Sequence, residues 1–411
     1  MVQEFEKAGY KIVNHNEKAD IYVINTCTVT NMSDRKSRQM LRRVKEQNKN
    51  AIVIACGCYA QVAKKELEEI EGIDLVLGNN EKTNIIKYVE DYFDNKNNII
   101  QIEDVMKDSK FIEFGNVIYT EKTRAVIKVQ DGCDRFCSYC IIPYARGRVR
   151  SRKPKNVIEE ITKIAKEGIK EVVITGIHVA SYGKDFKEKY ELIDLLEEVN
   201  KIEGIKRIRL GSIEPLLIEE EFIKRLIKLE KICPHFHLSL QSGCDETLKR
   251  MNRRYNTKQF EKITKLLRKY YEDVALTTDI IVGFPGETEE EFKATYEFLE
   301  KIKFYKMHIF KYSPRKGTKA EKMENQIDGN IKEKRSKKLI ELSEKNQKEY
   351  NKTYEGKEIE ILFEEKKEGK YIGHSKNYIQ ARCMTDRKLE NTIKKVKCYE
   401  AKDEYIVVET S

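Results

Sequence analysis

Short apolar runs alternate with amphipathic stretches along the first 93 residues, and this alternation predicts an α/β fold. The pattern predicts helices at 2–9, 33–49, 60–71 and 82–93, and strands at 11–14, 21–25, 51–55 and 75–78. Strands that alternate with helices form parallel sheets. We therefore expect a doubly wound parallel-sheet domain at residues 1–103. Because a crossover helix normally follows a first strand, the opening helix indicates either an unusual domain or one that lacks its first strand.

A second alternation begins after a polar stretch at 94–123, which is predicted to be a linker. The predicted strands are 124–130, 171–175, 207–210, 235–240, 275–282 and 305–310, and the helical patterns are 156–168, 191–202, 218–230, 257–270 and 287–302. Six parallel strands fall short of the eight of a closed barrel. We expect a partial (β/α)6 barrel in a domain at 119–349, which ends on a charged helix at 331–350.

After residue 350 the pattern changes to short strands. Five are predicted within about 60 residues, at 358–363, 370–374, 379–383, 393–398 and 404–409. This spacing predicts a small OB-like β-barrel at 350–411, a common nucleic-acid module. From Lys366 to Lys397 there are ten Lys and Arg against three Asp and Glu. Such an excess is either an RNA-binding surface or a solvated face.

Composition narrows the class of protein. The 411 residues carry 79 Lys and Arg against 69 Asp and Glu, and this net charge of +10 is compatible with a polyanionic partner. No apolar run approaches the roughly 18 residues of a membrane helix, and the first residues have no signal-peptide core. We expect no membrane association and a cytoplasmic location, where cysteines stay reduced. Ten cysteines in such a chain favour metal binding or catalysis over disulfides.

Three cysteines form one compact motif. Cys133, Cys137 and Cys140 follow the first predicted barrel strand with C-x3-C-x2-C spacing. Barrel chemistry takes place on the loops at the carboxyl ends of the strands. Three thiolates on one loop can hold three irons of a [4Fe–4S] cluster and leave the fourth iron open for an exogenous ligand. The alternatives are unliganded cysteines or a structural zinc site, which needs a fourth ligand that is not local.

The motif, with Tyr139 before its last cysteine, resembles the signature of the radical S-adenosylmethionine (SAM) superfamily. Asn-Thr-Cys27-Thr-Val-Thr and Gly-Cys58-Tyr-Ala-Gln resemble the second and third cysteine motifs of the methylthiotransferase family. That family adds a C-terminal RNA-binding TRAM domain, which corresponds to the predicted small β-barrel. The segments at 31–40, 144–152, 176–183 and 237–244 resemble the MtaB branch of the family.

The resemblance implies a function. The branch adds a methylthio group to adenine C2 of N6-threonylcarbamoyladenosine at tRNA position 37. It uses two SAM molecules and two [4Fe–4S] clusters, with a flavodoxin- or ferredoxin-like reductant. The alternatives are a sister methylthiotransferase acting on N6-isopentenyladenosine in tRNA or on a ribosomal-protein aspartate, and a non-catalytic iron–sulfur RNA-binding protein.

The resemblance and the pattern together nominate site residues, but no catalytic side chain. Cys133, Cys137 and Cys140 would hold the radical SAM cluster. Cys27 and Cys58 would hold an auxiliary cluster whose first family ligand is missing, with Cys56 as a candidate substitute. Gly176, Glu214 and Asp279 lie near strand ends where SAM would bind. The candidate RNA-binding residues are Arg35, Arg38, Arg42, Lys366, Lys367, Arg382, Lys394 and Lys395. Arg146, Arg148, Arg150 and Arg152 are either turned toward SAM or RNA or exposed, and His178 and His237 are expected to be hydrogen-bonded barrel residues.

Overall fold

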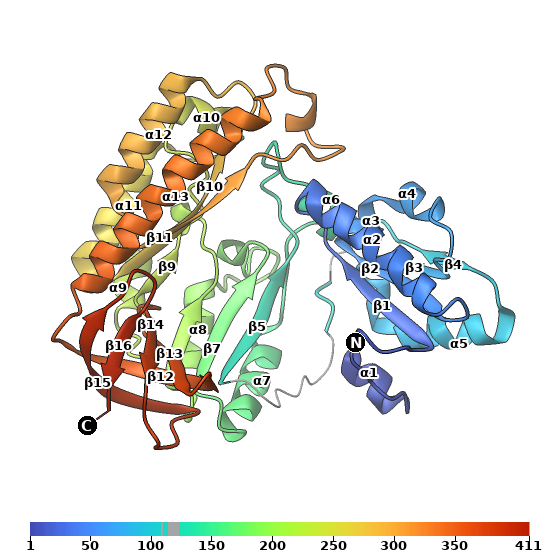
Figure 1. Ribbon diagram of the computed structural model, residues 1–411, viewed down its shortest axis with the longest axis horizontal. Helices are drawn as coiled ribbons and strands as arrows, with labels where there is room; N and C mark the ends of the chain where they lie inside the picture. Colours follow the sequence, from blue (N-terminus) through green and yellow to red (C-terminus); the bar gives the residue numbers. More distant parts are fainter. Residues whose placement is uncertain (108–109, 114–122, 411) are drawn as a thin grey trace. The chain divides into compact units, whose positions relative to one another are not determined.

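The computed structural model of the chain describes residues 1–107, 110–113 and 123–410. The chain divides into two compact units (Figure 1). The first unit combines residues 1–117, 131–150 and 313–322, and the second combines residues 118–130, 151–312 and 323–411. The segment that contains the three-cysteine motif therefore belongs to the same unit as the N-terminal sheet.

The first unit is built on a four-stranded parallel sheet. Its strands, in the order β1-β2-β3-β4, are β1 (Ile21–Thr26), β2 (Ile52–Gly57), β3 (Leu75–Leu77) and β4 (Ile99–Gln101). Its helices are α1 (Val2–Lys7), α2 (Asn31–Gln47), α3 (Cys58–Val62), α4 (Lys64–Glu68), η1 (Glu81–Asn84), α5 (Ile85–Asn95), α6 (Ile142–Arg146) and η4 (Ala320–Lys322). Every residue of β2 is buried, as expected for a strand with helices on both faces.

Three details of the first unit differ from the sequence prediction. Residues 11–14 are mostly exposed and form no strand, because the described chain gives them no neighbouring strand to pair with. The predicted helix at 60–71 is interrupted at Ala63, where α3 ends and α4 begins. The predicted linker contains β4, which follows a helix end formed by Lys96 in the left-handed conformation.

Helix α2 begins at a side-chain cap. Thr30 Oγ1 accepts a hydrogen bond from the Ser33 amide at 3.1 Å, which satisfies one of the free N–H groups of the first turn. The helix buries Leu41 and Val44 against the sheet. Its opposite face is therefore free to carry charge.

The second unit contains six parallel strands in chain order. They are β5 (Arg124–Asp131), β7 (Glu171–Gly176), β8 (Arg207–Leu210), β9 (His235–His237), β10 (Ala275–Val282) and β11 (Lys306–Lys311). The short strand β6 (Arg150–Ser151) extends the β5-β7-β8 sheet, and β9, β10 and β11 form a second sheet. Parallel bridges from Ile208 to Ile232 and from Ile213 to Leu238 join the two sheets. The predicted partial (β/α)6 barrel is confirmed.

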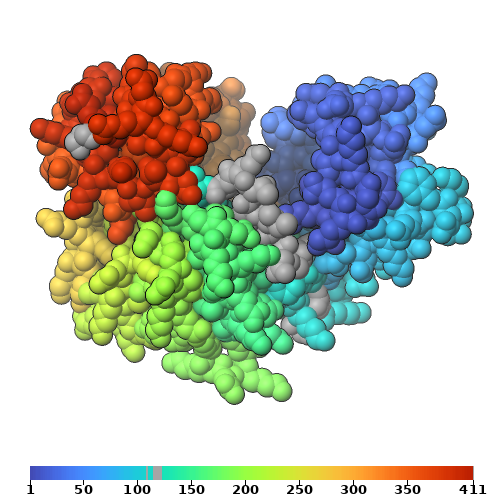
Figure 2. All heavy atoms as spheres, turned by 90° about the horizontal axis from the view of Figure 1, so that it is seen from below, coloured from blue at the N-terminus to red at the C-terminus, as the bar shows by residue number. Residues whose placement is uncertain are grey.

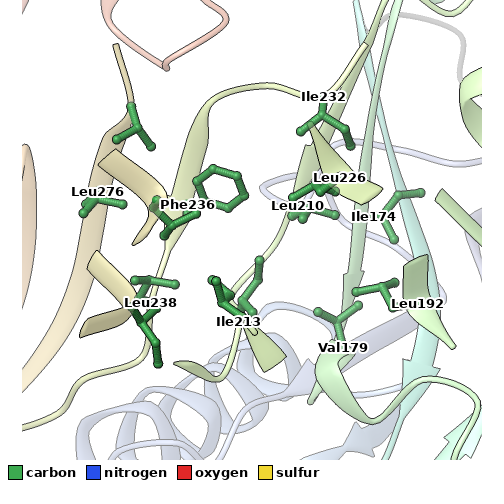
Figure 3. Close-up of a cluster of buried hydrophobic side chains, with 14 of the residues drawn as sticks. Ile174, Val179, Leu192, Leu210, Ile213, Leu226, Ile232, Phe236, Leu238 and Leu276 are labelled. Carbon is green, nitrogen blue, oxygen red and sulfur yellow. The ribbon is translucent and has the colours of Figure 1, made fainter. Parts of the chain in front are cut away.

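Helices cover the outside of these strands. They are α7 (Pro154–Lys166), η2 (Val179–Ser181), α8 (Leu192–Lys201), η3 (Pro215–Leu217), α9 (Glu220–Leu226), α10 (Asp245–Arg250), α11 (Thr257–Tyr270), α12 (Glu289–Ile302) and α13 (Gly329–Lys352). Alternate strand residues such as Ile174, Phe236 and Leu276 belong to the hydrophobic core that these helices complete (Figure 3). Because side chains alternate along a strand, Thr175, His237 and Thr277 lie on the opposite, inner side. The inner side of the barrel is therefore largely polar.

The C-terminal residues form the predicted small β-barrel. Its strands are β12 (Glu358–Lys367), β13 (Lys370–Ser375), β14 (Gln380–Cys383), β15 (Thr392–Ala401) and β16 (Ile406–Glu409), and they close in the order β12-β13-β14-β16-β15. The space-filling view shows these residues, in red, packed over the yellow and lime part of the same unit (Figure 2). The described part of the chain contains no helix that is both long and apolar enough to cross a membrane.

Two buried arginines of β8 join the small barrel to the large one. Arg207 is fully buried and donates to Glu360 Oε1 at 2.9 Å and to the His374 carbonyl at 2.8 Å. Arg209 donates to Glu171 Oε1 at 2.8 Å and to the Lys376 carbonyl at 2.9 Å. Buried charges persist only where partners compensate their lost hydration. These contacts therefore fix the small barrel at the amino end of the larger one.

Candidate iron–sulfur and cofactor site

The loop after β5 needs glycine at its two ends. Gly132 has a φ of +71°, and a Cβ atom there would lie 1.8 Å from the Arg148 carbonyl oxygen. Gly147 has a φ of +75°, and its Cβ would lie 2.1 Å from the Val105 carbonyl oxygen. The amide of Cys133 donates to the Gly147 carbonyl at 3.0 Å and closes the loop. Only glycine permits this close backbone approach.

The three thiols lie on this closed loop and are all partly exposed. The Arg135 amide donates to Cys133 Sγ at 3.4 Å, and the Cys140 amide donates to the Cys137 carbonyl at 2.9 Å. Among the described residues, no three His, Cys, Asp or Glu side chains are arranged to hold a single metal ion. In a [4Fe–4S] cluster each thiolate binds a different iron, so the sulfurs do not converge on one ion. Three thiols, with an amide directed at sulfur, are a donor set that fits such a cluster.

An aromatic residue shapes the interior of the loop. Phe136, between the first two cysteines, has a φ of +48°, which is uncommon for a bulky side chain. Its ring contacts Tyr144 edge-on at 5.7 Å, and the Arg148 guanidinium lies 4.9 Å from its centre. Strained residues of this kind concentrate at functional sites.

Cys58 lies where β2 turns into α3. Gly57 precedes it with a φ of +103°, and a Cβ there would lie 2.4 Å from the Thr26 carbonyl oxygen. The Cys58 sulfur accepts a hydrogen bond from Arg146 Nε at 3.0 Å and one from Asn79 Nδ2 at 3.8 Å. Arg146 ends helix α6, directly after the three-cysteine loop. The structure thus brings Cys58 into contact with the segment that follows Cys140.

Cys27 follows β1 and is exposed. The next residues are fixed by Arg315, which is almost completely buried. Arg315 pairs with Asp34 at 2.6 Å and donates to Asn31 Oδ1 at 2.7 Å and to the Thr28 hydroxyl. The loop between Cys27 and α2 is therefore held by a residue almost 300 positions away in the sequence.

Cys56 has a different environment. It is fully buried in the hydrophobic cluster of Ile52, Ile54, Leu75 and Ile85. Cys58 instead has polar neighbours at its sulfur. The apolar packing around Cys56 is typical of a structural thiol rather than of a metal ligand.

The three residues nominated for SAM binding lie in the second unit. A Cβ at Gly176 would lie 2.9 Å from three atoms of Gln130, so glycine allows β5 and β7 to pack closely. Glu214 is buried and lies 2.9 Å from His178 Nε2. Asp279 lies 3.1 Å from His237 Nε2. Both histidines thus have hydrogen-bonding or charged neighbours, and both carboxylates already have an imidazole partner.

The arginines of α2 form a basic surface. Arg35, Arg38, Arg42 and Arg43 line one shallow hollow, as their three- and four-residue spacing on a helix predicts. Arg38 is half-buried because it donates to the Tyr59 hydroxyl at 2.7 Å. Burial raises the pKa of Tyr59 to about 12, so this phenol stays protonated. Arg35 and Arg42 are exposed.

The basic candidates of the small barrel are more dispersed. Lys367 and Arg382 line one cavity together with Glu364, Glu365 and Glu368, so that surface has mixed charge. The Arg382 guanidinium lies over the Tyr405 ring, and the Lys366 ammonium lies 5.0 Å from the Tyr371 ring centre. Lys394 and Lys395 are exposed neighbours on β15. The Lys and Arg excess of this segment therefore does not gather on a single face.

The arginines after the cysteine loop divide by environment. Arg148 is exposed and pairs with Asp134 at 3.2 Å. Arg150 and Arg152 are buried, and Arg152 pairs with Glu160. Of the remaining cysteines, Cys233 is fully buried, and burial raises the pKa of its thiol to about 11. Cys383 and Cys398 are buried too, whereas Cys244 is partly exposed.

The chain matches two family models. The model described as "Radical SAM superfamily" covers residues 127–299, and "Uncharacterized protein family UPF0004" covers residues 1–78. Radical SAM methyltransferase TsrM from Kitasatospora setae, solved with cobalamin and a [4Fe-4S] cluster, matches with a TM-score of 0.54 and 16% identity over 74% of this chain and 66% of its own. That likeness concerns the fold. Fold, loop and models together define a radical SAM protein, and this class uses a [4Fe–4S] cluster and SAM.

Curated relatives narrow the class. The chain is 42% identical to threonylcarbamoyladenosine tRNA methylthiotransferase MtaB of Bacillus subtilis over 97% of its own length and 90% of that protein. It is 42% identical to MtaB of Aquifex aeolicus over 87% of both chains. A tRNA-2-methylthio-N(6)-dimethylallyladenosine synthase of Clostridium botulinum is 36% identical over 87% of this chain and 81% of its own. The chain belongs to the radical SAM methylthiotransferase family, in its MtaB branch.

Proposed function

We propose that this chain attaches a methylthio group to C2 of N6-threonylcarbamoyladenosine at tRNA position 37, using two SAM molecules. The observation that carries the proposal is the glycine-closed loop with three partly exposed thiols directly after the first barrel strand. The names of the 42% identical relatives supply the substrate.

The chemistry explains the cofactor. Adenine C2–H is a weak acid that no side-chain base can ionise, so its replacement requires a radical. A cluster held by Cys133, Cys137 and Cys140 would supply one-electron reduction of SAM, the radical chemistry that removal of hydrogen from C2 requires. The second SAM supplies the methyl group of the methylthio unit. The electron comes from a reductant protein, for which we propose a flavodoxin- or ferredoxin-like partner.

The residues of this chain divide the work in this proposal. Cys133, Cys137 and Cys140 hold the radical cluster, and Cys27 and Cys58 contribute to an auxiliary cluster that carries the sulfur. Arg146 and Asn79 orient Cys58 through their hydrogen bonds to its sulfur. Glu214 and Asp279, each held by an imidazole, present carboxylates to the amine or ribose hydroxyls of SAM.

The tRNA contacts would come from two parts of the chain. The exposed arginines of α2 form one, and the small barrel, which we assign as a TRAM domain at 350–411, forms the other. The remaining domains are proposed at 1–103 and 119–349. Phosphate contacts of this kind predict salt-sensitive binding.

The relatives that carry the dimethylallyladenosine name provide the second candidate substrate. Their 36–37% identity is lower than the 42% of the first two MtaB relatives. A direct comparison of tRNAs that carry each modified adenosine distinguishes the two substrates.

Anaerobic reconstitution with iron, sulfide, dithionite and SAM tests the proposal. We expect 5′-deoxyadenosine and, with tRNA that carries threonylcarbamoyladenosine, its 2-methylthio derivative by mass spectrometry. Cys133→Ala should abolish both products, whereas Cys244→Ala, a partly exposed cysteine outside the loop, should leave both unchanged. Absence of 5′-deoxyadenosine from the wild type would favour a non-catalytic iron–sulfur RNA-binding protein. Methylthiolation of isopentenyladenosine alone would replace the proposed substrate.

A further inference from the structure

A cavity of about 420 Å³ lies within the second unit, between the inner side of the large barrel and the small barrel. Its walls come from β8, β9, β10, β11 and the C-terminal strands. Four of the six histidines of the chain line it: His235, His237, His308 and His374. We call it the histidine cavity.

Two buried imidazole nitrogens of the histidine cavity lack a hydrogen bond among the described residues: His235 Nδ1 and His237 Nε2, the latter 3.1 Å from an Asp279 oxygen. His235 is 7% exposed, and its Nε2 lies 3.2 Å from Thr277 Oγ1. Its Nδ1 has no hydrogen-bond partner among the described residues, although it is buried. Burial holds the pKa of His235 well below its usual value, so the ring is neutral and offers one donor and one acceptor. An unsatisfied buried polar atom is costly unless a ligand completes it.

The cavity is also lined by a lysine that has no ion-pair partner among the described residues. This residue, Lys306, is exposed. Burial holds the pKa of His308 below its usual value. The charge of Asp279 raises this pKa, and the charges of His237 and Lys306 lower it. The other lining cation, Arg209, is buried and occupied by Glu171 and backbone carbonyls. The lining carboxylate, Glu404, is exposed.

The strand register connects this cavity with the proposed SAM residue Asp279. In the parallel pairing, Asp279 lies beside His308 and Thr277 beside His237. Asp279 itself lies 3.1 Å from His237. The histidine cavity therefore continues the same inner row of side chains, toward the amino end of the barrel.

We propose that the histidine cavity binds the carboxylate-bearing substituent on N6 of the adenosine, with Lys306 paired to its carboxylate. The inference rests on the proposed function, and it explains why the enzyme would select threonylcarbamoyladenosine over dimethylallyladenosine. The threonylcarbamoyl group presents a carboxylate, a hydroxyl and a urea, which match an ammonium and neutral imidazoles. An apolar dimethylallyl group would leave Lys306 and His235 desolvated and unpaired, and such polar mismatches are rejected strongly.

The test compares reconstituted full-length enzymes on two forms of one tRNA. One form carries threonylcarbamoyladenosine, and in the other its carboxylate is converted to the methyl ester. The variants are Lys306→Met, His308→Gln and a control, Lys262→Met, on the exposed surface of α11. We measure kcat and KM for methylthiolation, together with formation of 5′-deoxyadenosine.

We expect Lys306→Met to raise KM for the carboxylate form about 10- to 100-fold, the range of a lost charge-assisted hydrogen bond, with kcat nearly unchanged. The same variant should match the wild type on the methyl ester, which has no charge to lose. His308→Gln should give a smaller effect in the same direction, and Lys262→Met none. An equal effect of Lys306→Met on both forms, or no effect, would overturn the inference. A wild type that makes 5′-deoxyadenosine but leaves threonylcarbamoyladenosine unmodified would overturn the proposed function itself, and the inference with it.

Discussion

At the scale of single residues, Cys58 shows what spacing alone cannot supply. Its motif is visible in the sequence, but its two hydrogen-bond donors come from Asn79 and Arg146, which are 21 and 88 positions away. Hydrogen bonds of this kind orient metal ligands, and the loss of one typically lowers metal affinity or activity about 10- to 100-fold.

Cys58→Ala tests whether the chain completes a second cluster. If Cys58 is a ligand of the auxiliary cluster, the reconstituted variant should hold about half the iron of the wild type. It should still form 5′-deoxyadenosine, because Cys133, Cys137 and Cys140 are intact, but it should make no methylthio product. Iron analysis with product quantification checks this. Cys233→Ala, at a buried thiol in the second unit, serves as the control. Unchanged iron in Cys58→Ala would exclude Cys58 as a ligand.

Residues were predictable where chemistry imposes a local spacing. The three-cysteine loop and its glycines lie within 16 positions, so their roles are readable from the chain. Arg315 and His235 carry no such signal, because the partners of Arg315 are more than 280 positions away and the open nitrogen of His235 is defined only by three-dimensional packing.

At the scale of elements, the hydrophobic period located most strands and helices correctly. Its failures have physical reasons. Residues 11–14 contain the β-branched pair Ile12 and Val13, but a strand also needs a neighbouring strand. Strand β4 is only three residues long, and its polar surroundings hid it. The hydrophobic period of a segment indicates which of its faces is buried, but it does not indicate whether a neighbouring strand is available for pairing.

Helix α2 yields a prediction about tRNA. Arg35→Glu with Arg42→Glu removes two exposed positive charges without touching the buried contacts of Leu41 and Val44. If each arginine contacts a phosphate, the slope of log affinity against log salt should fall by about two, and charge reversal should weaken binding further. Filter binding at several salt concentrations measures this. The control is Lys163→Glu on α7, and an unchanged slope would remove α2 from the tRNA interface.

The junction of the two barrels yields a prediction about pH. Glu364 of β12 accepts from Arg124 and His374. Burial alone would raise the pKa of Glu364, but the hydrogen bond and charge of His374 and the charge of Arg124 outweigh it, so the pKa is lowered. A carboxyl whose folded pKa is below its ordinary value stabilises the fold above that ordinary value. This contribution is lost as the pH falls through the folded pKa.

Glu364→Gln should therefore lower Tm by about 2–4 °C at pH 7, as expected for a loss of about 1 kcal/mol. The difference from the wild type should shrink as the pH falls below the ordinary carboxyl value of 4.5. Thermal unfolding from pH 7 to pH 3 measures it. Glu365→Gln, at an exposed neighbour on the same strand, should behave like the wild type throughout. A difference that grows in acid would contradict the assigned pairing.

At the scale of the whole molecule, the order of the three architectures along the chain was predictable from the sequence. Which segments pack together into one compact unit was not predictable. Composition and period gave an α/β domain, a partial barrel and a small β-barrel in that order, and the structure has all three. The three-cysteine loop follows a barrel strand in sequence, yet it packs in one unit with the N-terminal sheet. Long-range contacts such as those of Arg146 and Arg315 determine that grouping.

The central claim is that this chain makes the 2-methylthio derivative of threonylcarbamoyladenosine in tRNA through its three-cysteine loop. The most direct measurement is mass spectrometry of tRNA nucleosides from a strain without the gene, complemented by the wild type or by Cys133→Ala. We predict that the derivative disappears on deletion, returns with the wild type and does not return with Cys133→Ala. An unchanged level after deletion, or full restoration by Cys133→Ala, would contradict the claim.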